Sequence, residues 1–240
     1  MFTEAFRAVA FDPSSFRTGG GTSAPDADAV AFNDALATPL SAERLTLLSS
    51  TIGSLKSAGV WSLLDRLILA SETSEASLRD VRNPAKTATA TNSPTFTTDR
   101  GFTGNGTDAY VSFGEAWNAS GNQYALYSAS FGIVVNGQTD TTSRNILGTD
   151  TELNTQMQVR GSGGTTAFRV NASVNGTLAT NPGTKLGHWS ASRRDSANMY
   201  GYKDGTLIAS VAQASSSIGS GNVTALRATT TYETSRFGAF

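Results

Sequence analysis

Residues 187–211 read GHWSASRRDSANMYGYKDGTLIASV, and this stretch decides the fold class of the chain. Trp189 and Ala191 alternate with polar residues, as they do on a strand with one buried face. A second strand-like run leads into the four residues 203–206, KDGT, and a third run follows. An Asp-Gly pair between two such runs is a strong hairpin signal, because glycine accepts a positive φ at no steric cost. The stretch therefore predicts three consecutive antiparallel strands.

The same period of two recurs in both directions from this stretch. Apolar and polar residues alternate over residues 127–135 and again over residues 168–174, where Asn175-Gly176 is expected to turn the chain. Strands that bury one face and expose the other are typical of an antiparallel sheet. Several of them at short spacing, joined by glycine and asparagine turns, predict a β-sandwich or jelly roll over residues 87–240.

Residues 26–86 show a helical period instead and are predicted to form a small helical segment. Asp26 can cap a first helix that stops at Pro39, Ser41 can begin a second, and Gly59 suits the residue after its end. Apolar residues recur at helical spacing in three groups: Val30, Phe32 and Leu36; Leu45, Leu48, Ile52 and Leu55; and Trp61, Leu64, Leu67 and Ile68. The third group predicts a third short helix, and residues 74–81 predict one or two further turns.

Residues 1–25 are predicted to form an N-terminal arm. Phe2, Phe6, Phe11 and Phe16 are spread along it without a regular period, and three glycines at 19–21 and a proline at 25 then interrupt the chain. One interpretation is a loosely packed terminus that covers its own domain. The other is a docking segment whose phenylalanines bury against a partner subunit, because four exposed phenylalanines are unfavourable in water.

The composition excludes several classes of function. Charged residues make up 15% of the chain and the formal net charge is −1, which argues against nucleic-acid binding and against electrostatic attachment to a membrane. No cysteine is present and His188 is the single histidine, so disulfides, thiolate metal sites and multi-histidine metal centres are excluded. The N-terminal residues, MFTEAFRAVAFDPSSF, do not read as a secretory signal, and no stretch is apolar enough for a transmembrane helix.

Two segments resemble a known family of sandwich domains. Residues 99–113, DRGFTGNGTDAYVSF, resemble the entry strand of concanavalin A-like (laminin-G-like) sandwiches. Trp189, Arg193, Tyr202 and Gly205 occupy positions that match the tryptophan, arginine, tyrosine and glycine of a later strand pair in that family. The resemblance covers roughly residues 95–240 and implies a concanavalin A-like jelly roll, preceded here by the helical segment.

The helical segment together with the start of the sandwich resembles virion proteins of tailed bacteriophages and prophages. The resemblance runs from Leu47 through Trp61, Leu64 and Asp65 to residues 92–102, NSPTFTTDRGF. It implies a structural virion component, such as a decoration, head-fibre or tail-fibre protein. Such a protein is made in the bacterial cytoplasm without a signal peptide and resides in the particle. Its expected partners are other virion structural proteins and further copies of itself.

The sequence offers no convincing catalytic constellation, so no enzyme is expected. A glycosidase on this fold needs two carboxylates facing one groove, and the nearest approximation, Asp150 with Glu152, is expected to lie in a polar loop between strands. His188, Ser190 and Asp195 can be drawn as a triad, but no nucleophile elbow or glycine-built oxyanion hole accompanies them. A glycoside hydrolase is therefore the least favoured of the functions considered.

No metal or cofactor is expected either. Some domains of this family bind Ca²⁺ at the rim of the sandwich through aspartate and asparagine oxygens. Asn105, Asp108, Asp150 and Asp204 supply this ligand type. Residues of these types are also frequent in the turns of any β protein, which is the preferred explanation of these four.

In a virion protein, the sandwich is expected to face outward and either to reinforce the shell or fibre or to bind a bacterial surface polysaccharide. Sugar rings stack on aromatic faces, and four aromatic residues fall near predicted loops or strand ends: Trp117, Tyr124, Tyr200 and Tyr232. Each of the four can instead serve packing. A stand-alone carbohydrate-binding module remains the alternative to a virion protein, and it predicts that residues 1–90 form a dispensable domain.

Overall fold

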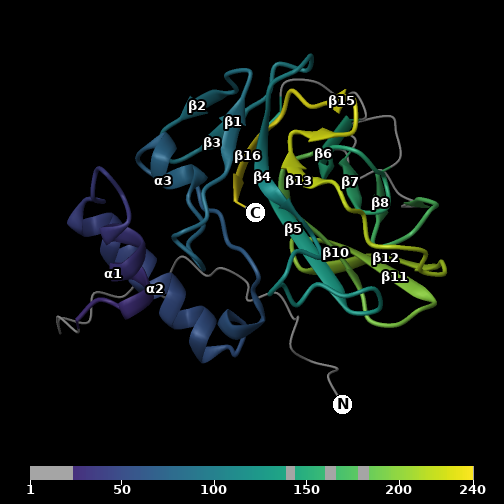
Figure 1. The fold of residues 1–240 in the computed structure, drawn as a ribbon, viewed down its shortest axis with the longest axis horizontal. Helices are drawn as coiled ribbons and strands as arrows, with labels where there is room; N and C mark the ends of the chain where they lie inside the picture. Colours follow the sequence, from purple (N-terminus) through teal and green to yellow (C-terminus); the bar gives the residue numbers. More distant parts are fainter. Residues whose placement is uncertain (1–23, 139–143, 160–165, 178–183, 240) are drawn as a thin grey trace.

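The computed structural model describes residues 24–138, 144–159, 166–177 and 184–239 (Figure 1). Two seven-stranded sheets, antiparallel throughout, pack against each other, and a small group of helices lies beside them. The prediction of an antiparallel jelly-roll sandwich preceded by a small helical segment is confirmed. Within the described ranges, no helix is both long and apolar enough to cross a membrane.

The first two helices form as the sequence predicts. Helix α1 (Ala27–Asp34) is capped by the side chain of Asp26, and helix α2 (Ala42–Ser57) is capped by the side chain of Ser41. Gly59 follows α2 with a positive φ of 68°, the conformation that favours glycine after a helix. Their apolar sides bury Phe32 and Ile52 in a helical cluster completed by these residues: Ala29, Leu36, Leu48, Trp61, Ala76 and Val81.

The prediction of a third helix through residue 68 is wrong. A short 3₁₀ helix, η2 (Trp61–Leu63), ends at Leu64, whose ψ of 125° is extended, and the next helix is α3 (Ser74–Leu78). Beyond η2, Leu69 forms a β-bridge with Ala239 and Ile68 is buried in the core of the sandwich. The chain leaves the helical conformation here because it pairs with a strand from the far end of the sequence.

Strand order and bounds define the two sheets. The first sheet runs β12 (Thr206–Ala212), β11 (Asn198–Lys203), β10 (Gly187–Arg193), β5 (Ala129–Gly137), β16 (Arg236–Ala239), β3 (Gly101–Thr103) and β2 (Thr95–Thr97). The second runs β1 (Thr89–Thr91), β4 (Tyr110–Ala116), β13 (Asn222–Ala225), β6 (Arg144–Thr149), β7 (Gln156–Val159), β8 (Ala167–Arg169) and β9 (Gly176–Thr177). A separate two-stranded hairpin joins β14 (Arg227–Ala228) to β15 (Thr231–Tyr232).

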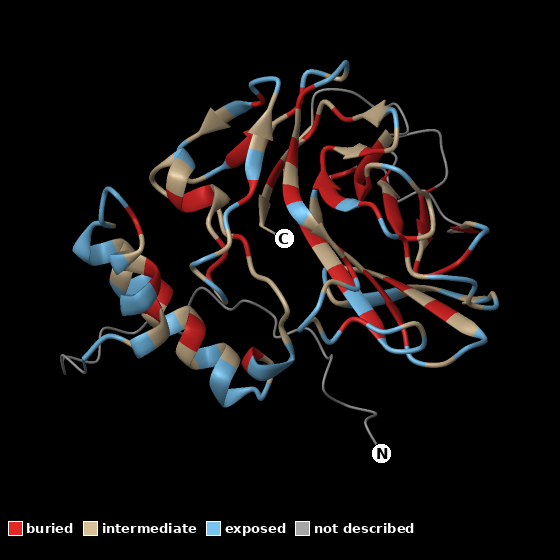
Figure 2. Ribbon diagram, in the orientation of Figure 1, coloured by how far each residue is buried: buried red, intermediate tan, exposed pale blue. Residues whose placement is uncertain are grey.

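The three strands predicted from residues 187–211 are β10, β11 and β12, and their hairpin is confirmed. Asp204 and Gly205 both have positive φ, 49° and 77°, as the two central residues of a type I′ turn require. Trp189 faces the core with 1% of its surface exposed, and its indole N–H donates to the Lys185 carbonyl at 2.6 Å. The buried face of this sheet is thus the face that the alternation predicts (Figure 2).

Two predicted strands are shorter than the alternation suggests. Strand β5 begins at Ala129, and Tyr127 before it lies in a turn with 53% of its surface exposed. Strand β8 ends at Arg169, after which Asn171 takes a left-handed φ of 53° and Val174 is 55% exposed. The Asn171 amide donates to the Ala125 and Leu126 carbonyls, so hydrogen bonding to another loop replaces the expected strand.

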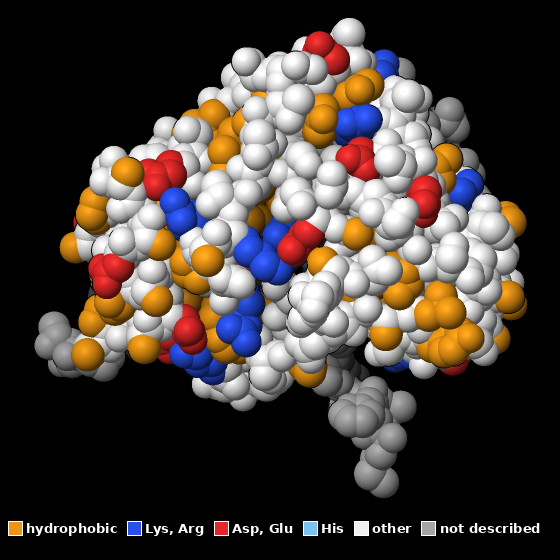
Figure 3. All heavy atoms as spheres, viewed as in Figure 1, with side chains coloured by type: hydrophobic (Ala, Val, Ile, Leu, Met, Phe, Trp, Pro, Cys, Tyr) orange, Lys and Arg blue, Asp and Glu red, His pale blue; other side chains and the backbone are white. Residues whose placement is uncertain are grey.

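An ionic network joins the segment after η2 to the sandwich. Arg66 donates to the Phe113 carbonyl at 2.9 Å and pairs with Glu115 of β4 at 2.8 Å, and Lys86 pairs with the same carboxylate at 2.9 Å. Asp80, with 1% of its side chain exposed, lies 3.5 Å from the Arg66 Nε. Figure 3 shows basic and acidic side chains side by side between the helices and the sandwich on this face.

Candidate functional site

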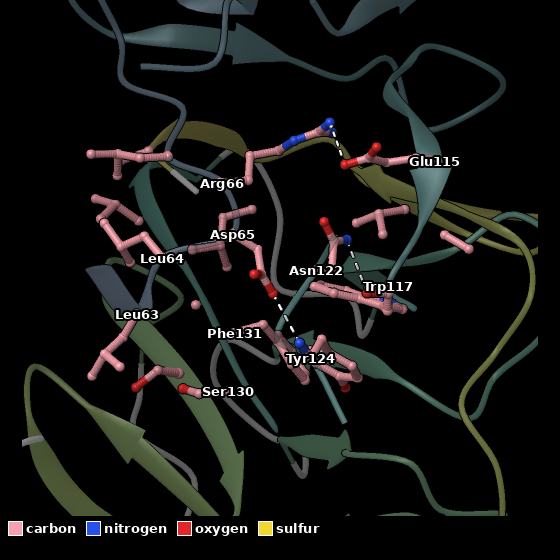
Figure 4. A pocket seen from close by; sticks show the side chains of 18 of the residues that line it. Leu63, Leu64, Asp65, Arg66, Glu115, Trp117, Asn122, Tyr124, Ser130 and Phe131 are labelled. Atoms are coloured by element: carbon pink, nitrogen blue, oxygen red, sulfur yellow. Dashed lines mark hydrogen bonds and ion pairs between the residues drawn. The ribbon is translucent and has the colours of Figure 1, made fainter. Parts of the chain in front are cut away.

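A cavity of about 320 Å³ lies between residues 63–67 and the sandwich, and we call it the Trp117 pocket (Figure 4). Its walls come mainly from residues 63–67, the end of β4 with the loop after it, the middle of β5, and His188 with Ser190 on β10. Val223 of β13 and Ala239 of β16 complete the lining. Leucine and aromatic side chains dominate the lining, and a few polar groups point into it. This mixture is typical of small-molecule sites in proteins.

The pocket exists because the first sheet is incomplete beside β5. Strand β10 pairs with β5 from residue 129 to residue 135, whereas β16 pairs with β5 only at Val134, Val135 and Gly137. Past Ala239 the described chain provides no further partner for this edge of β5. Residues 63–67 pass alongside the open edge and leave the cavity between them and the strand.

Trp117 and Tyr124, two of the four predicted glycan residues, meet in this pocket. Their rings stack with centroids 5.0 Å apart, and Phe131 lies 5.3 Å from the Trp117 ring. Trp117 is 7% exposed and Tyr124 is 9% exposed, so both rings mainly pack against the core and show a small part of their surface to the cavity. Burial raises the pKa of the Tyr124 phenol, whose hydroxyl is hydrogen-bonded to Thr155 at 3.1 Å.

The carboxylates of the pocket already have hydrogen-bond partners. Asp65 accepts from the backbone N–H of Gln123 at 2.6 Å and of Tyr124 at 3.0 Å, and Glu115 is paired with two cations. Asn122 donates to the Trp117 carbonyl at 3.0 Å. These bonds hold the loop after β4 against residues 63–67 and so fix the shape of the pocket.

The pocket opens onto the outer face of the first sheet. Gly132 of β5 pairs with Ser190 of β10, and Ser190 pairs with Tyr202 of β11, so a single row of residues runs from the pocket to a tyrosine. Adjacent strands lie about 4.8 Å apart, which places Tyr202 about 10 Å from β5. Two strands thus connect the cavity to an aromatic side chain on the surface.

Tyr200, Tyr202 and Arg194 form what we call the Tyr202 platform. The Arg194 Cζ lies 5.4 Å from the Tyr200 ring centroid, and its Nη2 donates to the Tyr202 hydroxyl at 2.9 Å. One guanidinium therefore holds both tyrosines in place. Tyr200 is the third predicted glycan residue. In the sequence, Tyr202 is singled out only by the family resemblance, although its spacing of two residues from Tyr200 puts both rings on one face.

Two further polar side chains lie on the same outer face as the platform. The Ser192 residue, next to Tyr200 in the ladder, is 9% exposed; its hydroxyl is buried and no described group hydrogen-bonds to it. Desolvation lowers the pKa of His188 below its ordinary value of 6.5, and the Asp204 carboxylate opposes this shift. The imidazole is therefore neutral at pH 7 and offers one donor and one acceptor.

Tyr232, the fourth predicted glycan residue, lies elsewhere. It belongs to β15 and its ring lies 6.1 Å from that of Tyr110, at the beginning of β4. Trp117 follows the opposite end of the same strand. The structure therefore groups Trp117, Tyr124 and Tyr200 around one surface and separates Tyr232 from them.

The carboxylates considered for catalysis outside the pocket serve loops and turns. Asp150 and Glu152 lie in the loop after β6, as expected, where Glu152 accepts from the Ser220 hydroxyl at 2.9 Å. Asp195 accepts from the backbone N–H groups of Ala197 and Asn198, each at 2.7 Å, and these bonds lower its pKa. The Asp195 carboxylate thus stabilises the β10–β11 turn.

The residues considered for calcium are spread over three loops. Asn105 donates to Asp108 at 2.8 Å within the β3–β4 loop, Asp150 follows β6, and Asp204 accepts from the His188 N–H at 2.8 Å in the β11–β12 turn. In the described part of the chain, no group of three or more histidine, cysteine or acidic side chains is placed to hold a metal ion.

Comparison with known proteins identifies a fold and no family. No protein-family model matches the chain, and no curated protein matches it. Among solved structures, the Trypanosoma rangeli sialidase in complex with 2,3-difluorosialic acid is 13% identical, with a TM-score of 0.53, over 74% of this chain and 30% of the sialidase. The receptor-binding domain of a botulinum neurotoxin C/D mosaic serotype is also 13% identical, with a TM-score of 0.51, over 73% of this chain and 48% of that domain.

A third similar structure is domain 4 of AbnA, an extracellular arabinanase from Geobacillus stearothermophilus, in complex with arabinotriose. It is 15% identical with a TM-score of 0.45, and the match covers 73% of this chain and 91% of that domain. This chain spans less than half the length of the sialidase and of the toxin domain. At such identities the likeness to the sialidase and the toxin domain establishes the β-sandwich fold alone.

Proposed function

We propose that this chain binds a bacterial surface glycan, without cleaving it, through the Trp117 pocket and the Tyr202 platform. The observation that carries the proposal is the row Gly132, Ser190 and Tyr202, which connects an open pocket to an arginine-held tyrosine pair. A binding site for a polysaccharide uses both features, because one sugar residue can enter the pocket while the neighbouring sugar residues lie along the surface.

The chemistry of this surface suits sugars. Pyranose rings present flat apolar faces that pack on tyrosine, and their hydroxyls need many donors and acceptors. Ser190 and His188 line the pocket, and Ser190 pairs with Tyr202 of the platform. The volume of about 320 Å³ lies at the lower end of the roughly 300–1,000 Å³ range of ligand pockets.

The proposal is non-catalytic because the two pocket carboxylates are part of the structural framework. A glycosidase needs one carboxyl group that delivers a proton and a second that attacks or activates water. Asp65 is bound by two backbone N–H groups and Glu115 by Arg66 and Lys86. If Asp65 were freed for catalysis, the loop after β4 would lose its anchor. If Glu115 were freed, its pairs with Arg66 and Lys86 would be lost.

The similar structures support recognition as the role of this fold. One was solved with a sialic acid derivative, and another is a receptor-binding domain. We propose the virion of a tailed bacteriophage as the setting, with attachment to other virion proteins and self-association, on the strength of the resemblance of residues 47–102. Mass spectrometry of purified particles tests this setting: fixed stoichiometry is expected, and a protein found only as a free monomer contradicts it.

The glycan proposal is tested by binding of immobilised bacterial surface polysaccharides to the wild type and to Tyr202→Ala. For a glycan that the wild type binds, loss of the tyrosine face is expected to weaken the affinity about tenfold, equivalent to 1.4 kcal/mol. Tyr127→Ala is the matched control, since Tyr127 is 53% exposed in the turn before β5 and does not line the pocket. Unchanged binding by Tyr202→Ala argues against the platform, and release of reducing ends argues against a non-catalytic role.

A further inference from the structure

An arginine packs against two neighbouring tyrosines at the end of the sandwich remote from the Trp117 pocket. The Arg227 Cζ is 4.4 Å from the ring centroid of Tyr110 and 5.4 Å from that of Tyr232. Its Nε donates to the Thr229 carbonyl at 2.5 Å. We call these three side chains, Tyr110, Arg227 and Tyr232, the Arg227 clamp; each is partly exposed.

The clamp has donors that the protein does not use. Among the described residues, no carboxylate pairs with Arg227, and its two terminal nitrogens have no acceptor. The hydroxyls of Tyr110 and Tyr232 likewise have no hydrogen-bond partner in the described ranges. Arg227 is partly exposed, so its terminal donors remain accessible to a ligand.

The backbone around the clamp is strained and well held. Leu226 and Thr229, on either side of β14, have left-handed φ angles of 66° and 49°, which bulky and β-branched residues rarely adopt. The Leu226 N–H donates to Ile146 at 2.8 Å and the Thr229 N–H donates to Thr149 at 2.7 Å. Strain of this kind persists where the surrounding structure fixes it, and it is concentrated at functional sites.

The clamp is a separate site from the Trp117 pocket. Tyr110 begins β4 and Trp117 follows the end of that strand. Seven residues at about 3.3 Å each separate the two sites by about 20 Å. A ligand group at the clamp therefore cannot be the same sugar residue as one in the pocket.

We propose that the Arg227 clamp binds the carboxylate of an acidic sugar, a uronic acid residue of a polysaccharide. A guanidinium matches a carboxylate through two parallel hydrogen bonds. The hydroxyls of the two adjacent tyrosines are further hydrogen-bonding groups for the same sugar, and the tyrosine rings pack against the arginine and restrict its side chain. This inference rests on the proposed glycan-binding function and names an acidic glycan as the ligand class.

The test is calorimetric titration of the full chain with oligogalacturonate and with the same oligosaccharide after reduction of its carboxyl groups. The wild type is expected to bind the acidic form at least tenfold more tightly than the reduced form. Arg227→Lys, which keeps the charge and loses the paired geometry, is expected to weaken binding about tenfold, and Arg227→Met to abolish the preference. Arg100→Met, at an exposed arginine, is the control and should bind as the wild type does.

Equal wild-type affinity for the acidic and reduced oligosaccharides overturns the inference, even where the variants fail to fold. The inference is also overturned if Arg227→Met keeps the full preference for the acidic over the reduced oligosaccharide. Binding of polyglutamate as tight as that of oligogalacturonate would overturn it as well, because the clamp would then recognise acidic peptide. If neutral surface glycans still bind and depend on Tyr202, the proposed function stands without this inference. If no glycan of either kind binds, both fail.

Discussion

Trp189 is a single residue whose place in the alternating sequence pattern explains its contribution to stability. Its ring is 1% exposed in the core, its indole N–H is bonded to Lys185, and the Lys203 ammonium lies 5.3 Å from its centroid. Trp189→Ala is expected to lower the free energy of unfolding by about 3–5 kcal/mol, because it removes a large buried aromatic and leaves a cavity. Urea denaturation followed by circular dichroism measures this loss.

Tyr127→Ala is the control for that measurement. Tyr127 is 53% exposed in a turn, and its truncation is expected to change the free energy of unfolding by no more than about 0.5 kcal/mol. An unfolding midpoint of Trp189→Ala equal to that of the wild type would mean that Trp189 is exposed and that the register of β10 is incorrect.

Only part of the candidate site can be predicted at this scale. Aromatic residues near strand ends mark places where a ring can be exposed, and this reasoning selects Trp117, Tyr124 and Tyr200. It cannot show that Trp117 and Tyr124 are mainly packed in the core, because their exposure depends on Phe131 and on residues 63–67. The same reasoning selects Tyr232, but it does not reveal the Arg227 clamp, since Tyr110 approaches Arg227 and Tyr232 only when β4 and β15 come together.

At the scale of elements, local interactions explain which predictions succeed. The hairpins of β10, β11 and β12 follow from the alternation of apolar and polar residues and from the Asp204-Gly205 turn. Helices α1 and α2 follow from their capping residues. All of these signals lie within a few residues of the element they determine. Residues 64–70 have helical spacing but pair with β16, which is far away in the sequence. A pattern that fits two structures is resolved by tertiary contacts, and these contacts are not visible in the local sequence.

Asp80 anchors this extended segment and predicts a pH effect. Its Oδ1 accepts from the N–H groups of Leu67 and Arg82 at 3.0 and 2.9 Å, and burial raises its pKa above 3.8 despite those bonds and the Arg66 charge. The folded chain therefore binds the Asp80 proton more tightly than the unfolded chain does. The stability that this proton contributes is lost as the pH rises through the raised pKa. The Asp80→Asn variant has no carboxyl group at this position and so does not lose this stability. Its free energy of unfolding relative to the wild type should therefore increase from about pH 3 to about pH 6.

Asp195→Asn provides a contrast of opposite sign. Backbone N–H groups lower the pKa of Asp195 below 3.8, so its contribution to stability is present at higher pH and is lost as the pH falls through the lowered value. The stability of this variant relative to the wild type should decrease as the pH rises over the same range. Chemical denaturation at a series of pH values measures both variants. Parallel curves for Asp80→Asn and Asp195→Asn would contradict the opposite environments described for them.

For the whole molecule, the helical segment and the sandwich are connected by more than a linker. Ile68 and Ala88 lie in the core cluster of the sandwich, and Arg66 and Lys86 both pair with Glu115 of β4. Removal of residues 1–90 would therefore take side chains out of the sandwich core, which argues against treating all of that region as a dispensable domain. A boundary at residue 86 stays a prediction from the sequence.

The arm at residues 1–25 allows the proposed virion setting to be tested on the molecule as a whole. Most of the arm, residues 1–23, lies outside the described residues, and the Asp26 cap and the α1–α2 pair follow it intact. Deletion of residues 1–25 is expected to leave the melting temperature within a few degrees of the wild-type value, since none of the described core residues is removed. If the phenylalanines of the arm dock on a partner subunit, the deleted chain should no longer join its particle, as measured by mass spectrometry of purified virions. Incorporation at the wild-type stoichiometry would rule out docking and leave the alternative, that the arm covers its own domain.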